Sequence, residues 1–227
     1  GRLRIGSFSA ASNVTGMRSP TREIAKLLHA HDAYACFDYA ASAPYVEINM
    51  NPAPDAAGGD ASYDAVFLSP HKFLGGPGSS GVLVFNERLY SRDLPPSVAG
   101  GGTVDYVSPL DQDFIADIEE REKAGTPGVL QTMKAALAMD LKQKVGVERI
   151  EAREHELLRR AMQQWSANER FELLGNADPA RRIGIVSFNL RDARGRYLHP
   201  KFVTVLLNDL FGIKSRAGCS CAGPYGH

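Results

Sequence analysis

The sequence predicts an α/β protein, in which a mostly parallel sheet with flanking helices is followed by a smaller C-terminal α/β domain. Two observations support this fold class. The N-terminal part alternates short apolar runs with a helical segment, a pattern typical of β–α–β units. After the long helical segment, the chain changes to a further run of strand, polar turn and helix. We therefore expect a first domain over residues 1–148 and a second over residues 149–227.

The first predicted unit is a strand, a helix and a second strand. Residues 3–8 form a strand-like apolar run, and Ser19 with Pro20 predicts the start of a helix. The apolar side chains of this helix share one face: Ile24, Leu27 and Leu28. Residues 33–37 form the next apolar run. Strands joined through a helix pair in parallel, so this unit predicts a parallel sheet.

Two more strands and a pair of helices complete the predicted first domain. Residues 65–69 and 81–85 are apolar runs joined through the glycine-rich loop 75–80. Residues 127–164 have helical periodicity, with a break expected at 145–146. One face of the first helix carries large apolar side chains: Leu130, Met133, Leu137 and Leu141.

The predicted second domain follows this helical segment. We expect a strand over 183–190, a polar turn over 191–196, a helix over 200–211 and a strand over 213–216. This alternation of strands and helices predicts a small α/β unit.

Charge and cysteine content exclude some classes of protein. The 26 Lys and Arg residues balance 26 Asp and Glu residues, whereas a protein that binds nucleic acid through a basic surface has a positive excess. No apolar run reaches the roughly 18 residues that a membrane span needs. Three cysteines are too few for a disulfide framework, so we expect a reducing, cytoplasmic setting.

Asp38 and Lys72 are the leading candidates for chemistry, because each follows an apolar strand. An arbitrary Asp is most often a cap or a solvated acid, and an arbitrary Lys lies on the surface. Ligands of parallel α/β proteins, however, bind where strands end. A lysine there can hold the aldehyde of pyridoxal phosphate as a Schiff base, while an aspartate keeps the pyridine nitrogen protonated.

Two other motifs carry weaker signals. The loop 75–81 lacks the Gly-Lys-Ser/Thr ending of a nucleotide-binding loop, so a flexible turn is the simpler interpretation. Cys219 and Cys221 have only His227 nearby, which is too few ligands for zinc. We therefore expect no metal site, and we interpret the two cysteines as free thiols on a loop.

Five short stretches, spread over nearly the whole chain, match a known pattern: 12–16, 38–44, 69–72 with its glycine loop, 124–127 and 216–224. They read Ser-Asn-Val-Thr-Gly, Asp-Tyr-Ala-Ala-Ser-Ala-Pro, Ser-Pro-His-Lys, Ala-Gly-Thr-Pro and Arg-Ala-Gly-Cys-Ser-Cys-Ala-Gly-Pro. Together they resemble the aminotransferase class V family of pyridoxal-phosphate enzymes, fold type I, and within it the cysteine desulfurase branch. The resemblance implies that residues 1–148 are the cofactor-binding large domain.

The resemblance implies a role at the cofactor for several matching residues. Lys72 would form the Schiff base and then transfer the α-proton, and Asp38 would pair with the pyridine nitrogen. Asn13 would lie near the phenolic oxygen of pyridoxal 5′-phosphate. Ser69 and His71 would bind its phosphate.

Three more implied roles concern the substrate and the subunits. Thr126 would reach the phosphate bound to a neighbouring subunit, which implies a homodimer with shared sites. Cys221 would receive sulfur as a persulfide, and Arg216 would contact the carboxylate of an amino acid substrate.

Two departures from the family pattern leave the function open. Ala41 stands where the family has a Gln, and the family's N-terminal segment, with further phosphate donors and a ring-stacking residue, has no counterpart here. We therefore expect the chain to be a fragment. Transamination and cysteine desulfuration compete as the reaction, and the alternative is a non-catalytic member that keeps the fold as a dimerising or structural protein.

Overall fold

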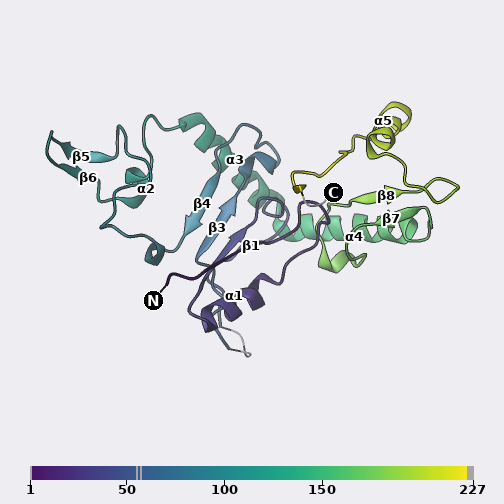
Figure 1. The fold of residues 1–227 in the computed structure, drawn as a ribbon, viewed down its shortest axis with the longest axis horizontal. Helices are drawn as coiled ribbons and strands as arrows, with labels where there is room; N and C mark the ends of the chain where they lie inside the picture. Colours follow the sequence, from purple (N-terminus) through teal and green to yellow (C-terminus); the bar gives the residue numbers. More distant parts are fainter. Residues whose placement is uncertain (1, 55, 57, 224–227) are drawn as a thin grey trace.

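The computed structural model describes residues 2–54, 56 and 58–223 as an elongated molecule with a four-stranded sheet near its middle (Figure 1). The strands lie in sequence order: β1 (Ile5–Ser9), β2 (Tyr34–Asp38), β3 (Ala65–Leu68) and β4 (Val82–Phe85). β1 pairs with β2 and β2 pairs with β3 in parallel, whereas β4 runs antiparallel to β3. The mostly parallel sheet predicted from the sequence is confirmed.

Helix α1 (Thr21–Ala30) connects β1 to β2 but starts later than predicted. Ser19 does not cap the helix, because its hydroxyl donates to the Ser9 carbonyl at 2.6 Å and its N–H donates to the Ala10 carbonyl at 2.9 Å. These bonds hold Ser19 against the end of β1. The backbone therefore turns into the helix only at Thr21.

The core forms where α1 and α3 pack near the sheet. A Cβ atom on Gly6 would lie 2.5 Å from the methyl carbons of Leu28, so glycine leaves the room that the Leu28 side chain of α1 occupies against β1. Phe37 of β2 is fully buried, and Val66 of β3 is 1% exposed. Other buried members of this cluster come from distant segments of the chain: Ala25, Ala43, Tyr63, Phe73, Ala138 and Ile183.

The predicted pair of long helices is confirmed, with α3 (Val129–Val145) and α4 (Val147–Trp165) meeting at Gly146. Gly146 has a φ of 88°, a conformation that favours glycine and separates the two helices. The buried side of α3 consists of Ala135 and Ala138. Its large apolar side chains face outward: Leu130 is 76% exposed and Leu137 is 65% exposed.

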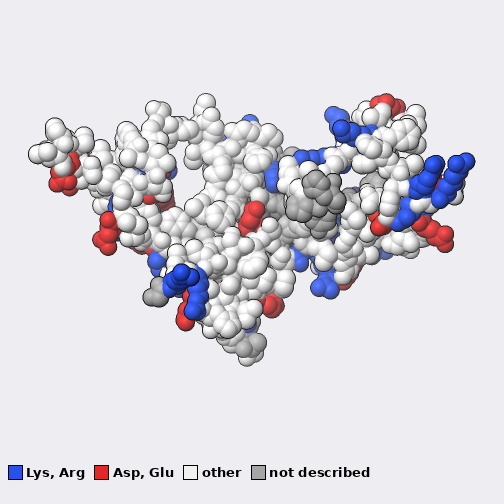
Figure 2. Space-filling model, viewed as in Figure 1, with Lys and Arg blue, Asp and Glu red and all other residues white. Residues whose placement is uncertain are grey.

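Charged side chains of both signs are scattered over the face of the molecule seen in Figure 2. Much of the surface over β3, β4 and α3 carries no charged side chain in this view. Exposed apolar side chains on these elements include Phe67, Leu83, Val84 and Met133. No helix within the described ranges combines the length and the hydropathy needed to cross a bilayer.

Smaller elements lie toward the two ends of the molecule (Figure 1). β5 (Val104–Val107) and β6 (Gln112–Phe114) form a hairpin next to α2 (Ile118–Arg121). β7 (Phe171–Leu173) pairs antiparallel with β8 (Phe188–Leu190), and α5 (Pro200–Phe211) follows as predicted. The 3-10 helices that lie wholly within the described residues are η1 (Pro70–Lys72), η2 (Glu87–Leu89) and η3 (Pro179–Arg181).

Two strand predictions near the C-terminal end were wrong in part or in full. The strand expected over 183–190 is confined to β8, because the N–H of Ile183 donates to the Gly16 carbonyl at 2.8 Å instead of extending a strand. No strand covers 213–216; the N–H of Ile213 donates back to Leu207 at 3.0 Å and closes the end of α5. The division of the chain at residue 148 stays a prediction.

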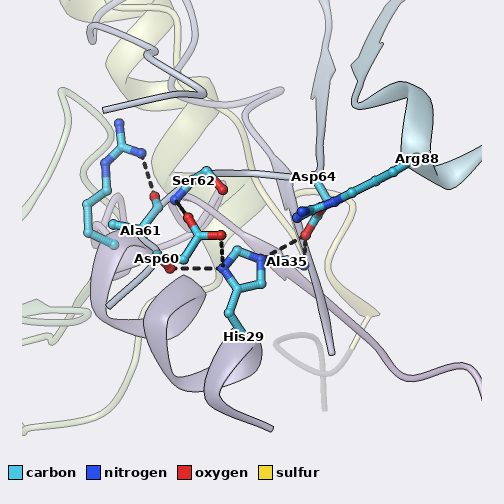
Figure 3. Close-up of polar contacts among 8 residues, drawn as sticks. His29, Ala35, Asp60, Ala61, Ser62, Asp64 and Arg88 are labelled. Atoms are coloured by element: carbon cyan, nitrogen blue, oxygen red, sulfur yellow. Dashed lines mark hydrogen bonds and ion pairs between the residues drawn. The ribbon is translucent and has the colours of Figure 1, made fainter. Parts of the chain in front are cut away.

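A buried carboxylate joins four elements at the amino end of the sheet (Figure 3). Asp64 is fully buried, just before β3, and its Oδ2 accepts from the Ala35 N–H at 2.8 Å and lies 2.9 Å from His29 Nε2. Its Oδ1 accepts from Arg88 Nε at 2.7 Å. The other ring nitrogen of His29 lies 2.8 Å from the Asp60 carbonyl oxygen. Asp64 thus links α1, β2 and η2 to the start of β3.

The geometry of this cluster favours the protonated form of His29. Both ring nitrogens of His29 face oxygen acceptors, so both bonds form only with the imidazolium. Burial lowers the pKa of His29, but the hydrogen bonds to Asp64 and Asp60 outweigh burial and leave that pKa above its usual value. For Asp64, burial raises the pKa, and the bonds from Ala35, His29 and Arg88 together leave it below its usual value.

We predict that Asp64→Ala destabilises the protein by about 3 kcal/mol. Removing the carboxylate leaves the charges of His29 and Arg88 without their partner in the folded protein. The free energy of unfolding from urea denaturation measures this loss. Asp93→Ala removes an exposed aspartate and should change stability by less than about 0.5 kcal/mol. Equal stability losses in the two variants would contradict the role given to Asp64.

We predict that the stabilisation due to His29 depends on pH. Because folding raises its pKa, this contribution is complete below the unfolded value of about 6.5 and is lost as pH rises through the folded pKa. The stability difference between the wild type and His29→Gln should therefore shrink as pH increases above neutrality. Denaturation curves measured across this range check the sign, and a difference that grows with pH would rule it out.

Candidate functional site

The first candidate site lies at the carboxyl edge of the parallel strands. β2 ends at Asp38, which pairs in register with Phe67 near the end of β3. β3 leads through Ser69 into η1, which ends at Lys72. The N–H of Lys72 donates to the Ser69 carbonyl at 3.0 Å and closes this turn. The parallel pairing therefore brings the predicted aspartate and lysine to one edge of the sheet.

Asp38 is held by its own turn and keeps one oxygen available. It is half-buried, and its Oδ1 accepts from the Ala40 N–H at 2.7 Å. Its Oδ2 has no hydrogen-bond partner among the residues that the structure describes. A fixed carboxylate with an unpaired oxygen is suited to accept a hydrogen bond from a protonated nitrogen of a ligand.

Lys72 and His71 line a cavity of about 560 Å³. Both side chains are exposed, and within the described ranges neither of them nor the half-buried Ser69 has a side-chain hydrogen bond to protein. The rest of the cavity wall is largely apolar and includes Phe73, Leu74, Leu141, Val145 and Ile150. The cavity therefore presents a primary amine beside an apolar surface, where a lysine can serve as a nucleophile.

A second lysine lines the same cavity and was missed from the sequence. Lys142 of α3 donates from Nζ to the carbonyls of Ala43 and Val46, both at 2.6 Å. Burial lowers the pKa of Lys142, against the opposing effect of nearby glutamates. The signal was its place one helical turn after Ala138, on the buried side of α3. Its two bonds occupy this amine, which leaves Lys72 as the available one.

The second candidate site is the loop that carries Cys219 and Cys221. In the C-terminal segment, the chain returns to the middle of the molecule, and this loop lies beside the segment that follows β1 (Figure 1). Asn13 Nδ2 donates to the Ser220 carbonyl at 2.6 Å, a contact across 207 positions of sequence. Arg216 Nη2 donates to Cys221 Sγ at 2.9 Å. Cys221 and Cys219 are both free, exposed thiols. The loop that carries Asn13 thus contacts the predicted sulfur-accepting loop.

The structure leaves some predicted site residues apart from these two groups. Thr126 is exposed between α2 and α3, and in the described part of the chain no hydrogen bond joins it to Asp38 or Lys72. Cys221 likewise has no described hydrogen bond to Lys72. Residues 224 and 227 lie outside the described residues. Among the residues that the structure describes, no group of three or more His, Cys, Asp or Glu side chains is arranged to hold a metal ion.

Comparison with known protein families gives one match over almost the whole chain. The model of the family Aminotransferase class-V matches residues 2–227. A probable cysteine desulfurase of Halalkalibacterium halodurans is 31% identical over 98% of this chain and 50% of its own length. One of Staphylococcus aureus is 33% identical with the same coverage. The chain spans about half the length of these curated relatives.

Solved structures share the fold of the chain. The apo cysteine desulfurase of Thermococcus onnurineus NA1 is 27% identical, with a TM-score of 0.82 over 97% of this chain and 51% of its own. A C-DES variant with glycine covalently linked to its PLP cofactor is 20% identical, with a TM-score of 0.71 over 94% of this chain and 52% of its own. At this identity the similarity shows the fold alone. With the sheet, the order of motifs and the matched residues in agreement, the chain belongs to the aminotransferase class-V family.

Proposed function

We propose that the protein containing this chain is a pyridoxal-phosphate-dependent enzyme that acts on an amino acid. The observation that carries the proposal is that the available Lys72 amine and the unpaired Oδ2 of Asp38 lie at the same edge of the sheet. Membership of the class-V family, and relatives named as cysteine desulfurases, support the same cofactor.

The polar groups at this edge fit the chemistry of the cofactor. Asp38 would hold the pyridine nitrogen, and Lys72 would supply the amine for the aldehyde carbon. Ser69 and His71 have side chains without described protein partners, which suits them to a phosphate. Asn13 donates one N–H of its side-chain amide to Ser220 and keeps a second N–H that can donate to the phenolic oxygen. The residues present therefore fit pyridoxal phosphate.

Lys72 also has a proton-transfer role in this proposal. Bound pyridoxal phosphate supplies an electron-withdrawing ring that makes the α-proton of an amino acid acidic. The amine of Lys72, at an apolar cavity wall, would take that proton and return it. Lys142 would take no part in proton transfer and would serve as a positioning residue, because its bonds to Ala43 and Val46 hold the turn that follows Asp38.

Cys221 supports desulfuration over transamination, because only desulfuration needs a thiol. This thiol is exposed, and its Sγ accepts a hydrogen bond from Arg216 Nη2 at 2.9 Å. The attacking thiolate would take sulfur from a bound cysteine and leave alanine. Contact of Arg216 with the substrate carboxylate stays a prediction, as does transamination by a chain in which Cys221 plays no part.

The assembly and its setting belong to the same proposal. The exposed Thr126 would reach the phosphate held in a neighbouring subunit, in a homodimer with shared sites. The cysteines of the described ranges are free thiols, which suits a reducing cytoplasm.

We predict that the full-length protein binds pyridoxal phosphate through Lys72. Added cofactor should give an absorption band near ~420 nm that is absent in Lys72→Ala, because the substitution removes the attacking amine. Lys144→Ala, which removes an exposed lysine of α3, serves as the matched control and should keep the band. A folded wild-type protein without the band would instead favour the non-catalytic, dimerising alternative.

We predict that Cys221→Ala abolishes alanine formation from cysteine in the full-length protein, because no thiol remains to receive the sulfur. Amino acid analysis after incubation with cysteine measures the product. Cys36→Ala removes a buried cysteine of β2 and should retain activity in the folded variant. Unchanged alanine formation in Cys221→Ala would remove Cys221 as the sulfur acceptor and leave transamination as the competing reaction.

A further inference from the structure

Cys219 and Cys221 lie within one tight turn. The N–H of Ala222 donates to the Cys219 carbonyl at 2.8 Å. The two central residues, Ser220 and Cys221, have φ values of 51° and 64°, the left-handed signs of a type I′ turn. Residues two positions apart are separated by at most about 7 Å between Cα atoms. A turn shortens this separation into the span of about 4.4–6.8 Å that a disulfide bridges, so sulfur chemistry between the two thiols is geometrically possible.

The turn is held from outside, which keeps the two thiols in this arrangement. Left-handed φ is unfavourable for residues other than glycine, so Ser220 and Cys221 need support. The bond from Asn13 to the Ser220 carbonyl, at 2.6 Å, supplies it at the centre of the turn. The pair is also accessible, because both cysteines are exposed.

The two thiols have different surroundings. Arg216 donates to Cys221 Sγ at 2.9 Å, whereas the Cys219 thiol has no described contact with a charged group. In thiol exchange, a hydrogen bond donated to the departing sulfur assists its release, and Arg216 provides such a bond to Cys221 alone of the two described thiols. The asymmetry therefore favours transfer of a sulfur atom from Cys221 to Cys219.

We propose that Cys219 is a second sulfur-transfer thiol, resting on the proposed delivery of sulfur to Cys221. The Cys219 thiolate attacks the outer sulfur of the Cys221 persulfide. A sulfur–sulfur bond forms to Cys219, the bond to Cys221 Sγ breaks, and Cys221 leaves as a thiolate beside Arg216. The outer sulfur keeps its proton, and no external oxidant or reductant is consumed. Cys221 is then ready to accept another sulfur while Cys219 holds the first one on an exposed loop.

A first experiment tests reach without using the enzyme reaction. The folded full-length protein is treated with less than one equivalent of 4,4′-dithiodipyridine, which places a thiopyridyl group on one exposed thiol. Attack by the neighbouring thiol should release a second thiopyridone for each reagent molecule. Cys219→Ser and Cys221→Ser should each release only one, and Cys36→Ala should match the wild type because Cys36 is buried. Release of only one thiopyridone by the wild type overturns the proposal.

A second experiment follows the sulfur during incubation with cysteine. Alkylation and peptide mass spectrometry should find the extra sulfur atom on both cysteines of the wild type, and on neither in Cys221→Ala. Sulfur on Cys219 in Cys221→Ala would overturn the transfer order. Release of sulfide with a Cys219–Cys221 disulfide would overturn attack on the outer sulfur. Sulfur on Cys221 alone overturns the transfer but leaves the proposed function standing, whereas sulfur on neither wild-type thiol overturns both.

Discussion

The buried Asp64 carboxylate is the interaction on which the arrangement of the sheet depends. It accepts from the backbone of β2, from His29 of α1 and from Arg88 of η2, and its own backbone leads directly into β3. A carboxylate without access to water is tolerated only when its oxygens are satisfied, and here both are. The requirement to satisfy these oxygens therefore selects one arrangement of the elements around β2 and β3.

The proposed chemistry depends on the same arrangement, at the opposite end of these strands. The parallel register that begins beside Asp64 carries β2 to Asp38 and β3 toward Lys72. Lys142 adds a second constraint, because its bonds to Ala43 and Val46 fix the segment that follows Asp38. An aspartate and a lysine that are far apart in sequence thereby lie at one edge of the sheet.

Large apolar side chains stay outside the core on several elements, among them α3 and the outer strands β1 and β4. Leu130 of α3, Ile5 of β1 and Leu83 of β4 are each more than half exposed. The core itself is built from small residues and a few aromatic rings, such as Ala138 and Phe37. The chain that forms it spans about half the length of its curated relatives.

The sequence alone determined most local elements of the main sheet, the long helices and the candidate residues, because apolar periodicity and glycine positions act within a few residues. It predicted the β1–α1–β2 unit, the break at Gly146, Asp38 at the end of β2 and Lys72 after β3. Only the tertiary structure decided the rest. The Asp64 cluster, the second cavity lysine Lys142 and the bond from Asn13 to the cysteine loop all join residues distant in sequence. Such contacts leave no periodic pattern, since their partners meet only after the sheet and helices have packed.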